Sequence, residues 1–124
     1  MANCPKFVIW SPVPAGSVLK GESSALHNGV KSADYNAHVH IVPPHAAPSI
    51  DWPTAVLDPG PASLALVAGG YGFTGDLACG GTGPTATLHM WIEDPTGKKL
   101  FDCTWTNGAA GTLTKVVGAI VVVP

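Results

Sequence analysis

Three of the five histidines lie close together in the stretch Asn36–His45, which reads NAHVHIVPPH. Imidazole is a frequent ligand of zinc and copper, and residues i and i+2 project from one side of a β-strand. His38 and His40 have this spacing, with backbones about 6.6–6.8 Å apart. His45 follows two prolines and could supply a third ligand. The spacing permits a divalent metal site formed by His38, His40 and His45, although simple alternation also yields two outward histidines.

The residues between these histidines predict which way the strand faces. The alternate positions are apolar and are expected to face a core, so both imidazoles of His38 and His40 should lie side by side on the solvent side. The apolar set is Tyr35, Ala37, Val39 and Ile41. A third ligand could also come from His89, with Asp102 orienting its ring.

The number of tryptophans indicates a ligand-binding site of a different kind from a metal site. The chain has four tryptophans although aromatic residues make up only 7% of it. A flat indole beside hydrogen-bonding groups is typical of carbohydrate sites, where the ring stacks on the sugar. Trp91 is expected on an outward strand face beside His89 and Asp102, and Trp52 in a proline-rich loop. These four residues are the predicted ligand-binding set; the alternative is that Trp91 packs against a second sheet or another subunit.

A hairpin is predicted between Thr87 and Thr106, with the turn at Asp94-Pro95-Thr96-Gly97. Closure by Asp94 and Gly97 would pair Glu93 with Lys98. The same register would pair Trp91 with Leu100 and His89 with Asp102 on the outward face. The opposite, core-facing set would be Leu88, Met90, Ile92, Phe101, Cys103 and Trp105. A bulged register, which would pair Met90 with Asp102 and mix the faces, is not preferred.

Motifs for catalysis are weak. Gly70–Gly75 matches GxGxxG, but the glycines and proline of the following residues 76–84 cannot sustain the helix that a dinucleotide needs, so a glycine-rich inter-strand loop is expected there. No Gly-x-Ser-x-Gly elbow or Gly-Lys-Ser/Thr phosphate loop occurs. Cys103, on the predicted core face, would be a poor nucleophile. Enzymatic activity would therefore depend on the histidines, and a non-catalytic protein is expected.

The three cysteines are Cys4, Cys79 and Cys103. An odd number prevents full pairing within one chain, and a Cys79–Cys103 bridge or free buried thiols are both compatible with the sequence. No signal peptide opens the sequence, so a cytoplasmic protein or export without such a signal is expected.

The composition restricts the classes of partner that are expected for this protein. Of 124 residues, 46% are hydrophobic and 11% charged, with a formal net charge of −2. So few basic residues argue against nucleic acid, and no apolar run reaches the roughly 20 residues of a membrane span. Val116–Val123 is apolar on both faces of a strand, so one face needs a cover besides the core. A second subunit is the favoured cover, which predicts a homo-oligomer; loops of the second sheet are the alternative.

The chain reads as a series of short strands punctuated by turns. With 15 glycines and 12 prolines, few windows are left for a helix. We expect one all-β domain over residues 1–124, an antiparallel two-sheet β-sandwich of seven or eight strands, immunoglobulin-like or jelly-roll-like. The expected strands are Lys6–Val13, Asp34–Val42, Ala62–Ala68, Ala86–Glu93, Lys98–Thr106 and Thr112–Val123, with edge strands near Gly16–Lys20 and Thr54–Asp58.

Three functions remain open from sequence. The first is a lectin-like, non-catalytic module that binds a glycan or other small molecule through an outward tryptophan. The second is a small metal-binding protein or metalloenzyme centred on His38 and His40, whose only cofactor would be a divalent ion. The third is a structural protein that self-associates.

Overall fold

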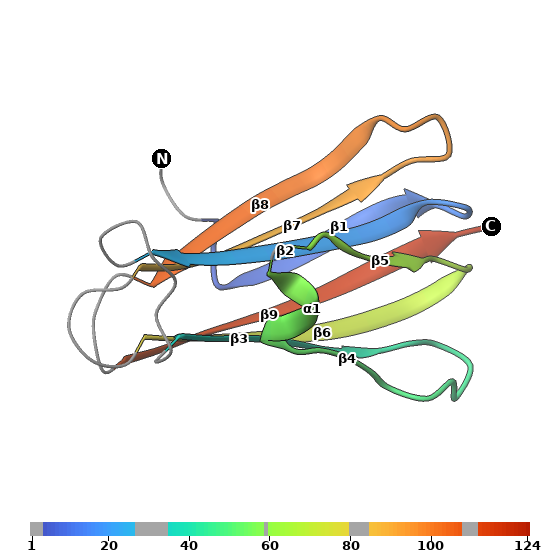
Figure 1. The fold of residues 1–124 in the computed structure, drawn as a ribbon. Coiled ribbons are helices and arrows are strands. Elements are labelled where there is room, and N and C mark those ends of the chain that lie inside the picture. Colours follow the sequence, from blue (N-terminus) through green and yellow to red (C-terminus); the bar gives the residue numbers. More distant parts are fainter. Residues whose placement is uncertain (1–3, 27–34, 59, 80–84, 108–111) are drawn as a thin grey trace.

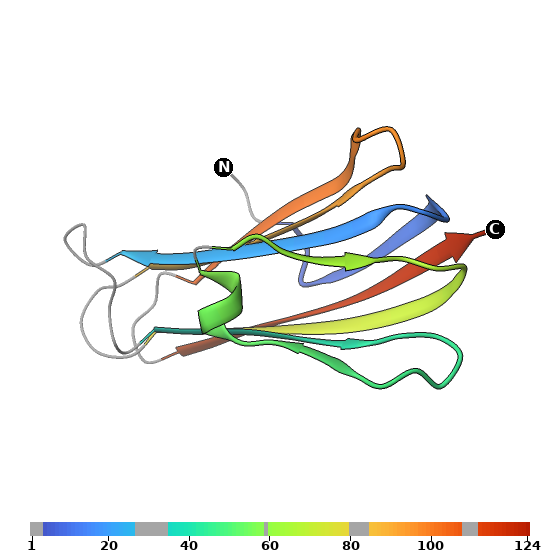
Figure 2. The same ribbon diagram turned by 45° about the vertical axis from the view of Figure 1, so that its right-hand side comes forward.

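A computed structural model describes residues 4–26, 35–58, 60–79, 85–107 and 112–124. They form two β-sheets stacked as layers, with one short helix at the side between the layers (Figures 1 and 2). The predicted two-sheet β-sandwich is confirmed. The described part contains nine strands, β1 to β9, more than the seven or eight expected.

The two sheets differ in size and in strand direction. The five-stranded sheet has the order β1-β9-β6-β3-β4, and the four-stranded sheet has the order β5-β2-β7-β8. Neighbours are antiparallel except β1 and β9, which run parallel. The strands are β1 (Phe7–Pro14), β2 (Val18–Leu26), β3 (Tyr35–Val42), β4 (Ile50–Trp52), β5 (Ala62–Ala65), β6 (Gly69–Cys79), β7 (Thr85–Glu93), β8 (Lys99–Asn107) and β9 (Thr112–Val123).

Alternation along the strands creates the core between the sheets. On β3, Ala37, Val39 and Ile41 are fully buried, as their period of two predicts. On β9, the buried set Val116, Ile120 and Val122 alternates with exposed valines. Strands of the other sheet supply the opposing layer, with Leu19, Leu88, Met90, Ile92 and Trp105 almost completely buried.

Two segments differ from the sequence expectation. Gly70–Gly75 lies inside β6, paired with β3 and β9, so the expected glycine-rich loop is wrong. Thr54–Leu57 forms a single helical turn, α1, after Pro53 rather than an edge strand. Proline is tolerated at a helix start, where its missing N–H costs no intrahelical bond, and Leu57 then fills the core from this turn.

The predicted register of the β7–β8 hairpin is wrong by one residue at the turn. Glu93 pairs with Lys99 and Ile92 with Leu100, because the turn closes with a hydrogen bond from Asp94 N to Lys98 O of 2.9 Å and Gly97 adopts φ 88°. Leu100 therefore packs on the core rather than joining the outward face.

A bulge in β8 shifts the pairing by a further residue. Met90 pairs with Cys103, and between this pair and Ile92–Leu100 two residues of β8 oppose Trp91. Phe101, the first of the two, has φ 52°, a backbone conformation that turns a strand locally. The bulge keeps Cys103 and Trp105 on the core face as expected, and leaves Asp102 exposed.

The disulfide joins Cys4 to Cys103, so a Cys79–Cys103 bridge is excluded. The bridge holds the N-terminal segment against β8, where Cys4 N also donates to Thr104 O at 3.2 Å. The next residue of the N-terminal segment, Pro5, accepts a hydrogen bond of 2.9 Å at its carbonyl oxygen from the indole Nε1 of Trp105. Residues 4–5 thus cover part of the outer edge of β8, which would otherwise be unpaired.

Candidate functional site

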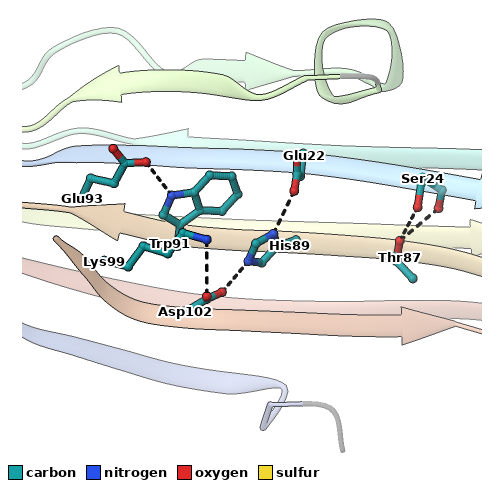
Figure 3. Close-up of polar contacts among 8 residues, drawn as sticks. All are labelled: Glu22, Ser24, Thr87, His89, Trp91, Glu93, Lys99 and Asp102. Carbon is teal, nitrogen blue, oxygen red and sulfur yellow. Dashed lines mark hydrogen bonds and ion pairs between the residues drawn. The ribbon is translucent and has the colours of Figure 1, made fainter. Parts of the chain in front are cut away.

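The outer face of the four-stranded sheet carries a continuous row of polar side chains (Figure 3). They project from β2, β7 and β8 at positions that alternate with core residues. We call the following residues the polar face: Lys20, Glu22, Ser24, Thr87, His89, Trp91, Glu93, Lys99 and Asp102.

His89 lies at the centre of the polar face and joins three strands. Its Nδ1 lies 3.0 Å from Glu22 Oε1 on β2, and its Nε2 contacts Asp102 Oδ1 on β8. Ionised carboxylates only accept hydrogen bonds, so both contacts are hydrogen bonds when the ring carries two protons. The predicted neighbours His89 and Asp102 thus meet, through the β8 bulge rather than through direct pairing.

Trp91 is outward-facing, as predicted, but it is only 6% exposed. Its ring stacks on His89 with centroids 4.3 Å apart, and Lys99 Nζ lies 4.8 Å from the ring centroid (Figure 3). The indole Nε1 donates to Glu93 Oε2 at 2.9 Å. Neighbouring polar side chains therefore cover the ring, which holds His89 in place and offers no bare stacking surface.

A polar hollow lies beside His89. It is lined by Glu22, Ser23, Ser24, Asp58, Thr87 and His89. Ser24 and Thr87 hydroxyls are joined at 2.7 Å, and the buried Ser23 Oγ has no hydrogen-bond partner within the part of the chain that the structure describes. The sequence does not predict Glu22 and Asp58 as neighbours of His89. Glu22 lies more than 60 positions before His89 and Asp58 more than 30, and no local pattern connects residues at such separations.

Trp52 lies in the core, not in a surface loop. It belongs to β4, pairs with Val39 and is 5% exposed. Its ring packs against Gly21 of the opposite sheet, where a Cβ would come within 3.0 Å of it. Trp52 therefore lies apart from the polar face and fills the space between the sheets.

His38 and His40 project side by side from the outer face of the five-stranded sheet, as predicted, with side chains 36% and 40% exposed. Both turn toward Asp51 of β4: His40 Nδ1 lies 2.7 Å and His38 Nε2 3.3 Å from its Oδ1. The hydrogen bond from His40, helped by the charge of both rings, lowers the pKa of Asp51, while desolvation opposes this change.

His45 does not join the other two histidines. It follows the prolines after β3, with φ 62°, and its Nε2 donates to Ala68 O at 2.8 Å. Across the described ranges no group of three or more His, Cys, Asp or Glu side chains has an arrangement that could hold a metal ion. The predicted triad of His38, His40 and His45 is therefore not assembled, and Asp51 is the group that the two neighbouring histidines share.

The outer face of the five-stranded sheet is apolar where β1, β9 and the end of β3 lie. Phe7 and Ile9 are 62% and 61% exposed. A shallow hollow beside them is lined by Val42, Gly72, Thr74, Val117 and their neighbours His40, Phe73 and Gly118. We call the following exposed residues the apolar face: Phe7, Ile9, Val42, Val117, Val121 and Val123.

Comparisons with known proteins add no assignment: no family model, curated protein or solved structure matches the chain. Among the residues that the structure describes, no helix is long and apolar enough to cross a membrane.

Proposed function

We propose that this protein is a self-associating structural protein that assembles into a homo-oligomer through its apolar face. The observation that carries the proposal is the exposure of Phe7 and Ile9, each more than 60% accessible, beside exposed valines of β9. Soluble monomers rarely expose contiguous apolar patches larger than a few hundred Å², and larger patches usually mark interaction surfaces.

The position of β9 supports this proposal. β9 is an interior strand, paired on both sides by β1 and β6. One of its faces packs in the core, while Val117, Val121 and Val123 remain 38–42% exposed on the other. The strand that the sequence marks as apolar on both faces thus has one covered face and one that another molecule would cover.

The test is the molar mass of the protein by light scattering between micromolar and millimolar concentration. We expect the mass to rise with concentration. Val121→Lys should raise the dissociation constant at least about tenfold, because burial of an ammonium group in an apolar interface is unfavourable. Ser63→Lys, on the exposed side of β5 in the other sheet, is the matched control and should associate like the unmodified protein. A constant monomer mass would refute the proposal.

A second candidate, lectin-like carbohydrate binding, is favoured by the polar hollow beside His89. The carboxylates of Glu22 and Asp58, the hydroxyls of Ser24 and Thr87 and the imidazole of His89 belong to residues that line it, and such groups suit a polyhydroxylated ligand. In this proposal Glu22 and Ser24 bind sugar hydroxyls, and Trp91 acts by holding His89. Because the indole is covered, the ligand would be bound mainly by hydrogen bonds.

A glycan array followed by calorimetry tests the second candidate. Glu22→Gln should weaken binding of any glycan that is found by roughly 10- to 100-fold, the usual effect of losing a hydrogen bond to a charged group. Glu93→Gln is the matched control, since Glu93 lies on the same face but does not line the hollow. Equal losses in both variants, or no glycan bound at millimolar concentration, would remove this candidate.

A further inference from the structure

The apolar face carries both a ridge and a hollow. The ridge is formed by Phe7 and Ile9 of the edge strand β1, the two most exposed large side chains of this face. The hollow lies over β6, because Gly72 has no side chain, and no atom lies within 4 Å of the position its Cβ would take.

The strand register places the ridge and the hollow at the same position along the strand direction. Ile9 pairs with Ala119 of β9, and Ala119 pairs in turn with Gly72 of β6. One pair further along, Phe7, Val117 and Thr74 form the next row. Ridge and hollow are therefore two strands apart, about 10 Å, with β9 midway between them.

From this placement we propose that the occupant of the apolar face is a second copy of this chain, related by a two-fold axis along β9. Such an axis places Ile9 of each copy over Gly72 of the partner subunit, and Phe7 over Thr74 of the partner subunit. The contact is reciprocal, as a two-fold interface requires. Ala119, the smallest outward side chain in this part of β9, lies where the two sheets approach most closely.

The apolar composition of the two rows favours this partner, whereas the apposed area and one exposed charge indicate a weak dimer. The two rows from β1 to β6 consist of Phe7, Val117 and Thr74 and of Ile9, Ala119 and Gly72, and none of these residues is charged. Lys115, the next outward residue of β9, would lie near the same lysine of the partner subunit and weaken the contact. An axis along β9 apposes β1, β9 and β6 of the two copies. Three strands about 4.8 Å apart and about eight residues long present roughly 380 Å². The total of roughly 760 Å² lies below the range of stable specific interfaces, about 1,200–2,000 Å², so the dimer should be weak and should form only at high protein concentration.

The inference rests on the proposed self-association, and a pair of charge variants distinguishes the two. Ile9→Glu and Gly72→Lys each place two charges in the homodimer and should each raise its dissociation constant at least tenfold. An equimolar mixture of the two variants can form a heterodimer. One of its two contacts then sets the introduced carboxylate against the introduced ammonium group, and the other is the unmodified contact between Ile9 and Gly72. We expect sedimentation velocity to show a dimer in the mixture at concentrations where each variant alone is monomeric.

Circular dichroism and thermal melting of each variant check that it is folded, which its exposed position favours. A mixture that stays monomeric while the unmodified protein dimerises would overturn the two-fold geometry and leave self-association standing. A dimer that survives Gly72→Lys alone would overturn it as well. An unmodified protein that is monomeric at millimolar concentration would overturn both.

Discussion

Cys4→Ser is expected to lower the free energy of unfolding by about 2–4 kcal/mol. The bridge from Cys4 to Cys103 spans a sequence separation of 99 residues and so restricts the unfolded chain strongly. In the folded protein it also holds Cys4 and Pro5 against β8, where Cys4 N donates a hydrogen bond to Thr104 O and Pro5 O accepts one from Trp105 Nε1.

Urea unfolding followed by tryptophan fluorescence measures this loss. Adding a reductant to the unmodified protein should reproduce it, whereas reductant should not change Cys4→Ser any further. Identical unfolding midpoints for the oxidised protein, the reduced protein and the variant would show that the N-terminal tether does not stabilise the fold.

Gly118→Ala is expected to destabilise the protein by about 1–3 kcal/mol, the usual effect of overpacking a core. Gly118 faces the core on β9, and a Cβ there would overlap ring atoms of Phe73. That ring cannot move freely, because it packs at 5.4 Å on the buried Trp10.

Gly72→Ala is the matched control, on the neighbouring strand but on the outer face. No atom lies within 4 Å of its Cβ position, so its effect on stability should stay within about 0.5 kcal/mol. Thermal or urea unfolding compares the two. Equal stability of both variants would contradict the placement of Phe73 over Gly118.

The architecture could be predicted because alternation is a local property of the sequence. Ala37, Val39 and Ile41 identify their own core face, and the same pattern turns His38 and His40 outward. The apolar run Val116–Val123 likewise indicated that β9 would need a cover on both faces. Each of these inferences needs only the period of a strand.

Other features depend on contacts distant in sequence or on backbone angles that no pattern encodes. The hairpin register differs from the predicted one first at the turn, which closes with the hydrogen bond from Asp94 N to Lys98 O. It differs again at Phe101, an ordinary strand residue by type, which adopts φ 52° and inserts a bulge. The prolines around Trp52 predict a surface loop, but tertiary packing against Gly21 places the ring in the core. The partner of Cys103 was ambiguous because three cysteines allow several pairings.

The neighbours of His89 show the same limit. Asp102 could be expected beside it from the hairpin, whereas Glu22 comes from β2, which the sequence marks only as a short edge strand. β2 is in fact a central strand of nine residues between β5 and β7. Only the pairing of β2 with β7 brings Glu22 opposite His89 and creates the polar hollow.

Methyl NMR with a soluble paramagnetic agent tests the central claim, self-association through the apolar face, most directly. The exposed methyl groups of Ile9, Val117 and Val121 should be strongly relaxed in dilute protein and protected in concentrated protein. Val56 and Val67, which are 45% and 56% exposed outside the apolar face, provide internal controls and should be relaxed equally at both concentrations. Relaxation of Ile9, Val117 and Val121 that is independent of concentration up to the millimolar range would contradict the account.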